Sequence, residues 1–86
     1  MTSAAFNEAE FRTWLIDRIA AVLKRDPSAI DADTPLVDYG VDSLYALAIV
    51  DDIENHLGVS VEATMMWDYP SVAALTSALA DQLTAH

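Results

Sequence analysis

Apolar residues recur at helical spacing in three segments of this chain, and this periodicity limits the fold more than any other feature. The segments cover about residues 8–25, 43–57 and 71–83, with prolines and glycines between them. Val59 and Val61 alternate with polar residues, but the stretch is short, and we interpret it as an apolar connector. One helical turn is expected near Glu62–Met66. The sequence therefore predicts an all-α fold, a small bundle of three principal helices plus one short helix.

The first helix has a detailed start signal. We expect Asn7 to cap it, Glu10 to return a hydrogen bond to the cap, and Phe6 to pack against Phe11. The residues that follow at the spacing of one buried face are Phe11, Leu15, Ile19, Val22 and Leu23. Because Asp26-Pro27 ends the pattern, the helix is predicted from about Glu8 to Arg25, with Lys24 and Arg25 at its C-terminal end.

A loop of about sixteen residues leads to the second helix, and so long a connection in a small domain is often functional. We expect Ile30, Leu36 and Val37 to tie this loop to the core. The second helix is predicted from about Ser43 to Leu57, with Gly58 just after its last turn. Its inward side on a helical wheel comprises Ala46, Ile49, Val50, Ile53 and Leu57, and its outward side Leu44, Leu47, Asp51 and Asn55.

The C-terminal part predicts a turn followed by a helix. Trp67-Asp68-Tyr69-Pro70 is expected to turn, and Ser71 to cap a final helix that runs to about Leu83. Leucines at helical spacing, with alanines between them, suit close packing in this helix. We expect Met65, Met66 and Trp67 to pack in the core or at its edge, because so small a bundle needs large side chains to fill it. A partner-binding apolar patch is the alternative interpretation of these three residues.

Charge is distributed unevenly along the chain. The 4 Lys and Arg residues against 14 Asp and Glu residues give a net charge of −10, and all the basic residues lie in the first 25 positions. From Asp26 onward the chain has Asp and Glu but no Lys or Arg. A surface of this charge repels nucleic acid and anionic lipid, and it favours partners that present Lys and Arg. Charge kept only for solubility is the alternative interpretation.

Several classes of protein fit the sequence poorly. The absence of cysteine excludes a disulfide framework and thiolate metal sites. No apolar run is long enough to span a bilayer, and residues 1–5 lack the basic flank and apolar stretch of a signal peptide. We therefore expect a soluble, cytoplasmic protein that binds neither nucleic acid nor membrane.

A Ser–His–acid catalytic triad is not expected. It would need Ser43 beside His56 or His86, yet thirteen residues of one helix separate Ser43 from His56 by about 20 Å. His86 is the last residue and is expected to be frayed. His56 is interpreted as an ordinary residue near a helix C-terminus, where a cation is favoured.

Asp31, Asp33 and Asp38 suggest a calcium loop, but the pattern fails. Starting from Asp31, the fifth position is Pro35, which has no side-chain oxygen, and the glycine position is Leu36. We expect these acids to cap turns and stay solvated, with no metal bound.

Ser43 has the most informative surroundings of any nucleophile in the chain. With Asp42 as the helix cap, Ser43 falls on the first turn, where backbone N–H groups lack partners within the helix. Those groups and the helix dipole favour a phosphate on the serine oxygen. Three further features surround it: the long loop, the outward Leu44 and Leu47, and the acidic residues. Together they favour a serine that is modified by one enzyme and then presented to several others. A solvated serine without a function is the alternative.

Two stretches resemble an acyl carrier protein of the polyketide-synthase type. Leu36–Leu47, which reads LVDYGVDSLYAL, is similar to the family's leucine, glycine and Asp-Ser-Leu run ahead of its second helix. Trp67–Leu75 is similar to the aromatic-Asp-Tyr-Pro-Ser/Thr segment before the last helix. Peptidyl carriers usually have Gly-Gly-x-Ser at the modified serine, so Asp42 favours the acyl branch. The resemblance implies an N-terminal extension at 1–7, an acyl carrier domain at 8–83 and a C-terminal tail at 84–86.

The resemblance further implies that Ser43 carries a 4′-phosphopantetheine arm, which a phosphopantetheinyl transferase takes from coenzyme A. The thiol of the arm would hold acyl intermediates as thioesters in polyketide (antibiotic) biosynthesis, and the protein itself would catalyse nothing. Alternatives are a carrier of fatty acyl or aminoacyl units and, in a different class, an unmodified helical interaction module.

The partners implied are acyl-activating or acyltransferase enzymes, ketosynthase and other polyketide synthase components with basic docking surfaces. They would meet a monomeric carrier through Asp42, Leu44, Leu47, Asp51 and Glu54. Two departures from the family bear on this surface: acids stand at Asp51-Asp52, as in discrete carriers of dissociated systems, and Ala48 stands where many fatty-acid carriers have glutamate. A stand-alone carrier is expected, and an excised domain of a larger synthase is the alternative.

Overall fold

The computed structural model describes residues 6–84, so the expectations for residues 1–5 and for His86 lie outside the described residues. Its elements are α1 (Glu8–Leu23), η1 (Pro27–Ala29), η2 (Leu36–Tyr39), α2 (Ser43–Leu57), α3 (Met65–Asp68) and α4 (Val72–Thr84). η1 and η2 are short 3₁₀ helices. The described part of the chain contains no strand, which confirms the predicted all-α class and the connector at Val59–Val61.

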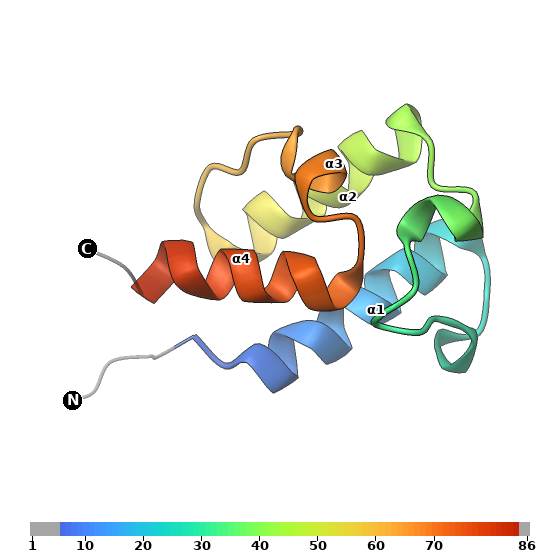
Figure 1. The fold of residues 1–86 in the computed structure, drawn as a ribbon, viewed down its shortest axis with the longest axis horizontal. Helices are drawn as coiled ribbons and strands as arrows, with labels where there is room; N and C mark the ends of the chain where they lie inside the picture. The colour runs from blue at the N-terminus through green and yellow to red at the C-terminus, as the bar shows by residue number, and fades with distance from the viewer. Residues whose placement is uncertain (1–5, 85–86) are drawn as a thin grey trace.

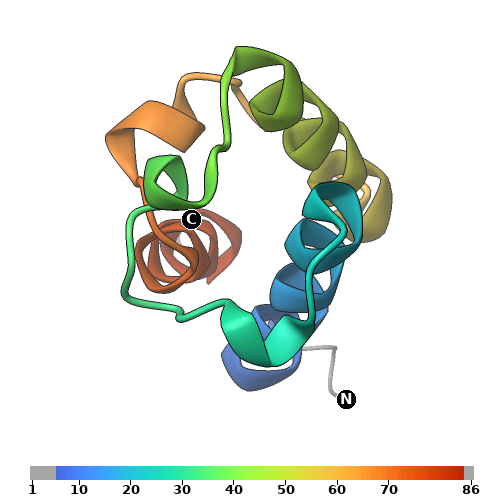
Figure 2. The same cartoon turned by 90° about the vertical axis from the view of Figure 1, so that its right-hand side faces the viewer.

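α1 packs against both α2 and α4 and runs antiparallel to both of them (Figure 1). Figure 2 looks nearly along α4 and shows α1 and α2 side by side across the core from it. The centre of the core consists of fully buried aliphatic side chains from these three helices: Leu15, Ile19, Ile49, Ile53, Leu75 and Leu79. This packing places the start of α2 at the end of the bundle opposite the start of α1 (Figure 1).

The predicted start of α1 is confirmed. Asn7 Oδ1 accepts a hydrogen bond from the Glu10 N–H at 3.0 Å, and the rings of Phe6 and Phe11 lie 5.3 Å apart. Within the described residues, the return bond from the Glu10 carboxylate is not formed. The Asn7 cap and the Phe6–Phe11 contact therefore define the helix start without it.

The end of α1 comes two residues earlier than predicted. Lys24 adopts the left-handed conformation (φ 57°), which cannot continue a right-handed helix. The Lys24 and Arg25 N–H groups donate to the carbonyls of Ala21 and Ala20, the latter at 2.8 Å, the two bonds of a Schellman motif. This local cap, and not Pro27, ends the helix.

The loop before α2 is held to the link between α3 and α4. The Leu36 N–H donates to the Pro70 carbonyl at 2.7 Å, and the Ala73 N–H donates to the Ala32 carbonyl at 2.9 Å. Ile30 and Leu36 are buried as predicted, but Val37 is 55% exposed. In the short η2 turn Leu36 takes the inward position, and the next side chain points away from it.

The predictions for α3 are partly wrong. The helix begins at Met65 and includes Trp67 and Asp68, for which the sequence predicts a turn. Met65 and Met66 are buried, whereas Trp67 is 50% exposed. Because successive helical residues are rotated by about 100°, two inward residues in a row leave the third pointing outward. In α4, the Ser71 cap is confirmed by its hydroxyl oxygen, which accepts from the Ala74 N–H at 3.2 Å.

Candidate functional site

Asp42 caps α2 as the sequence predicts. Its Oδ1 accepts hydrogen bonds from the N–H groups of Leu44 and Tyr45, each at 3.1 Å. The Asp42 carbonyl accepts from the Ala46 N–H at 2.8 Å, which starts the helical hydrogen-bond pattern. Ser43 is therefore the first residue of α2, and within residues 6–84 neither its amide nor its hydroxyl has a hydrogen-bond partner.

The chain segment before Ser43 directs this side chain to the surface. Gly40 adopts a left-handed conformation (φ 87°) just after η2, which is favourable for glycine and lets the chain turn toward α2. Val41 then anchors the segment in the core, with 4% of its surface exposed. Ser43, two residues further on, lies exposed at the start of the helix.

A shallow hollow of about 590 Å³ lies along α2 between Leu44 and Glu54. It brings together four of the five side chains predicted to contact partners: Leu44, Leu47, Asp51 and Glu54. Leu44 is 77% exposed and Leu47 55% exposed, so the outward face predicted for α2 is confirmed. Val61 and Ala63, from the connector after α2, also line the hollow, so it spans two segments of the chain.

The acids in the second half of α2 differ in their engagement. Glu54 Oε2 accepts a hydrogen bond from the Val61 N–H at 2.8 Å, which fixes the connector to the helix. Asp52 pairs with Arg18 of α1 at 3.0 Å. Asp51 is exposed and forms no ion pair with any described residue. Among these three acids, Asp51 is therefore the one whose carboxylate has no partner among the described residues.

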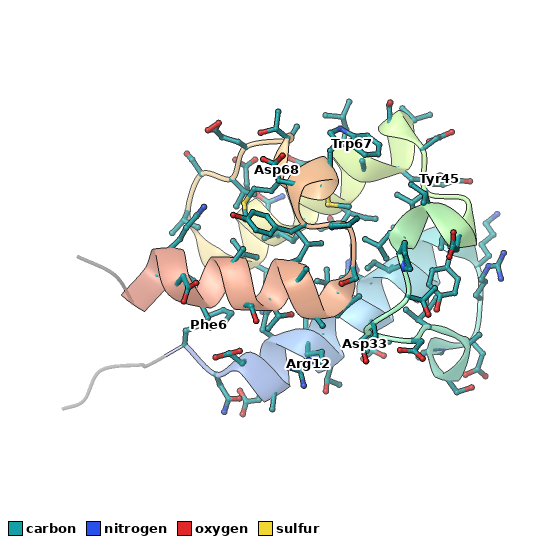
Figure 3. All side chains as sticks on the ribbon, in the orientation of Figure 1. Phe6, Arg12, Asp33, Tyr45, Trp67 and Asp68 are labelled. Carbon is teal, nitrogen blue, oxygen red and sulfur yellow. The ribbon has the colours of Figure 1, made fainter. Side chains whose placement is uncertain are left out.

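The apolar surface extends beyond Leu44 and Leu47, and it includes Trp67, for which the sequence favoured packing in the core or at its edge. Among the described residues, the large apolar side chains that are exposed are Val37, Leu44, Tyr45, Leu47, Trp67 and Tyr69. All lie on η2, on the first half of α2, or at and just after the end of α3. The Leu36–Pro70 hydrogen bond joins η2 to the segment after α3. Figure 3 shows Trp67 on the side of α3 away from α4. A four-residue helix has too little periodicity to reveal this from sequence.

A second groove, of about 600 Å³, lies at the opposite end of α2, and Phe6, Phe11, Trp14 and His56 are among its lining residues. The His56 ring is stacked on Trp14, so this residue has a specific packing partner that the sequence did not reveal. His56 is thus remote from Ser43, and the two residues do not form a catalytic pair.

The described residues hold neither a metal site nor a membrane span. No group of three or more His, Asp or Glu side chains within 6–84 is arranged to hold a metal ion. Asp31 instead stabilises a turn, where its Oδ1 accepts from the Asp33 N–H at 2.8 Å, as expected for a turn-capping acid. No helix in the described part of the chain is long and apolar enough to cross a membrane.

The surroundings of Ser43 are compatible with a group attached through the serine oxygen. The hydroxyl is exposed and has no partner among the described residues, so attachment breaks no internal hydrogen bond. The sequence predicts free N–H groups on the first turn that favour a phosphate, but the Asp42 carboxylate already accepts hydrogen bonds from two of them. The site therefore suits covalent attachment more than tight binding of a free anion.

Comparison with known proteins agrees with this geometry. The family described as "Phosphopantetheine attachment site" matches residues 13–79. The chain is 34% identical over 80 residues to a phenolphthiocerol/phthiocerol polyketide synthase protein of Mycobacterium tuberculosis, a match that covers 93% of this chain and 4% of that protein. The chain thus spans only a small fraction of the length of this curated relative.

Two solved structures match nearly their whole length. A free-standing peptidyl carrier protein from Acinetobacter baumannii matches with a TM-score of 0.86 and 31% identity, covering 91% of this chain and 98% of that one. The acyl carrier protein LipD from Actinoplanes friuliensis is 38% identical with a TM-score of 0.76, covering 100% of this chain and 99% of that one.

Proposed function

The chain belongs to the phosphopantetheine attachment-site family, whose members are carrier proteins and not enzymes, and on that premise we propose that Ser43 is the attachment residue. The observation that carries this proposal is the exposed Ser43 hydroxyl, without a partner among the described residues, on the first turn of α2. Two other serines are engaged: the Ser28 hydroxyl donates to Asp26, and the Ser71 hydroxyl oxygen caps α4. Ser60 and Ser77 are exposed as well, but neither stands at the start of a helix.

Attachment needs little from this chain beyond an accessible hydroxyl. Ser43 Oγ loses its proton and forms a bond to the phosphorus that carries the pantetheine of coenzyme A, and adenosine 3′,5′-bisphosphate leaves. Since His56 lies at the other end of α2, it does not act as the base for this proton. Once bound, the group supplies a thiol that holds an acyl chain as a thioester.

We propose acyl intermediates of polyketide biosynthesis as the cargo. The likeness to a polyketide synthase supports this assignment, as does Asp42 immediately before the serine. A second candidate cargo, aminoacyl units, is favoured by the structural likeness to a peptidyl carrier protein. Parallel loading assays with acyltransferases and with amino-acid-activating enzymes separate the two.

For partners, we propose acyltransferase, ketosynthase and other synthase components with basic docking surfaces. The hollow offers the apolar Leu44 and Leu47 beside the exposed acid Asp51. From Asp26 onward the chain has no Lys or Arg, so a cationic rim on the partner complements this face. We also propose that the carrier acts as a monomer, because a second copy docking here through the same face would bring like charges together.

Incubation with coenzyme A and a promiscuous phosphopantetheinyl transferase, followed by intact-mass measurement, tests the attachment site. One phosphopantetheinyl mass increment is expected for the wild type and for Ser77→Ala, a matched control on the exposed side of α4. No increment is expected for Ser43→Ala. An unmodified wild type, or a modified Ser43→Ala variant, would sink the proposal and favour an unmodified interaction module.

A further inference from the structure

The start of α2 is not the open anion site that a free helix N-terminus would be. One carboxylate oxygen, Asp42 Oδ1, holds the amides of both Leu44 and Tyr45 at 3.1 Å. The next amide, that of Ala46, is used by the Asp42 carbonyl. Of the amides that begin the helix, the one left for a new acceptor is that of Ser43 itself.

A phosphate on Ser43 Oγ would compete with Asp42 for the same donors. Helix N-termini bind phosphate when several N–H groups converge on it, and one amide is a weak substitute for such a cluster. The Asp42 carboxylate and a phosphodiester both carry negative charge, so each disfavours the other at the helix start. The competing carboxylate is part of the residue next to Ser43, so it stays at the helix start whether or not the phosphate is attached.

We propose that Asp42 is a positioning residue that keeps the phosphodiester of the arm off the start of α2, so that the arm leaves Ser43 without being held by its own carrier. This inference rests on the proposed attachment at Ser43 and adds a role for its neighbour. The cap defines the first turn that presents the serine, and it also occupies the donors that would otherwise retain the arm. The phosphate of the arm is then available to a partner enzyme, because the carrier protein does not bind it.

The test compares protein spectra before and after loading from coenzyme A. Amide ¹H and ¹⁵N shifts of Leu44 and Tyr45 report which acceptor they have, and the carboxyl ¹³C shift of Asp42 reports on the cap. Three variants separate charge from capping. Asp42→Asn keeps an oxygen acceptor without the charge, Asp42→Ala removes both, and Asp38→Ala removes an exposed charge nearby that caps no helix.

In the wild type, Asp42→Asn and Asp38→Ala, loading is expected to leave the Leu44 and Tyr45 amide shifts nearly unchanged. In Asp42→Ala, those amides should exchange about fivefold faster before loading, because a helix cap has been lost. They should then move downfield on loading as the phosphate takes them. Reduced mobility of the arm, measured by ³¹P relaxation, should accompany this shift.

Each unfavourable outcome has a distinct meaning. If loading moves the wild-type Leu44 and Tyr45 amides downfield and shifts the Asp42 carboxyl carbon, the phosphate displaces the cap and the inference is wrong. It is also wrong if loaded Asp42→Ala shows no amide shift. The wild-type measurement decides the question alone if Asp42→Ala cannot be loaded. If intact mass shows no arm on Ser43, the proposed attachment itself fails, and this inference with it.

Discussion

The imidazole of His56 lies flat on the indole of Trp14, with ring centroids 3.9 Å apart and planes inclined by 9°. Phe11 adds a third ring, 6.2 Å from His56. This stack joins the last turn of α2 to the first half of α1, at the end of the bundle opposite Ser43. The two helices are also joined by the Arg18–Asp52 pair.

Replacing His56 by alanine should lower the free energy of unfolding by about 1 kcal/mol, the usual contribution of an aromatic pair beyond burial. Urea denaturation measures the change. Asn55→Ala, at an exposed neighbouring position with no ring contact, is the control and should have a smaller effect. Equal losses in the two variants would show that the stack contributes nothing specific.

Lys24→Gly should stabilise the protein. The left-handed conformation at φ 57° costs a residue with a Cβ atom about 1 kcal/mol relative to glycine. In a domain of this size, such a gain raises the melting temperature by about 4–8 °C. Lys24→Ala removes the same charge but keeps the Cβ, so it should show no comparable rise. A rise of the same size in both variants would trace the effect to the charge.

Thr76→Val should also stabilise the protein. Thr76 is fully buried in α4, and its hydroxyl has no hydrogen-bond partner among the described residues. Valine has nearly the same shape, so the change removes an unsatisfied polar group at a gain of about 1 kcal/mol. Thr76→Ser keeps the hydroxyl and loses a methyl group, and it should destabilise the protein. Chemical denaturation of the wild type and the two variants measures these changes. A loss of stability in Thr76→Val would show that the hydroxyl is hydrogen-bonded to a buried water.

The pKa of Asp26 is lowered by hydrogen bonds from the Ser28 backbone N–H and, secondarily, from the Ser28 hydroxyl. A lowered pKa means that the charged form adds stability above the ordinary pKa, and that this contribution is lost as pH falls through the lowered value. Ser28→Ala should raise the pKa of Asp26 part of the way back, since the backbone bond persists. Carboxyl ¹³C titration measures the midpoint, and an unchanged midpoint would assign the whole effect to the backbone.

Leu44→Asp should reduce acyl transfer to and from partner enzymes by at least about tenfold, because it places a charge on the apolar part of the proposed docking face. Stability should hardly change, since Leu44 is 77% exposed. Ala21→Asp, on the exposed face of α1, adds the same charge away from the hollow and should transfer normally. Normal transfer by Leu44→Asp, measured as kcat/KM for the carrier, would place docking elsewhere.

The structure also changes how Asp42 can be tested. The sequence alone predicts that Asp42→Lys impairs modification of the serine or transfer to partners while leaving helical content intact. Because the carboxylate caps two amides of α2, that variant loses the cap together with the charge. Asp42→Asn is the cleaner probe of charge, and Asp51→Lys tests the rim with no cap at risk. A rim reversal should alter the salt dependence and the association rate more than the dissociation rate.

Much of α2 could be predicted from the sequence because its signals are local. The Asp42 cap, the Gly58 ending and the spacing of the inward residues each involve positions within a few residues of one another. These signals placed the helix at Ser43–Leu57, with the serine on its first turn and Leu44 and Leu47 outward, as the structure has them. The end of α1 was less predictable, because no sequence rule marks Lys24 for a left-handed conformation.

The sequence by itself therefore determined the helical class, the position of Ser43 and the acidic character of its surroundings. The tertiary structure alone decided that Trp67 is half exposed, that Glu54 holds the Val61 N–H, and that His56 stacks on Trp14. Each of these features depends on how segments distant in the chain, or lacking a periodic pattern, come together in three dimensions. Local capping and periodicity carry no information about such contacts.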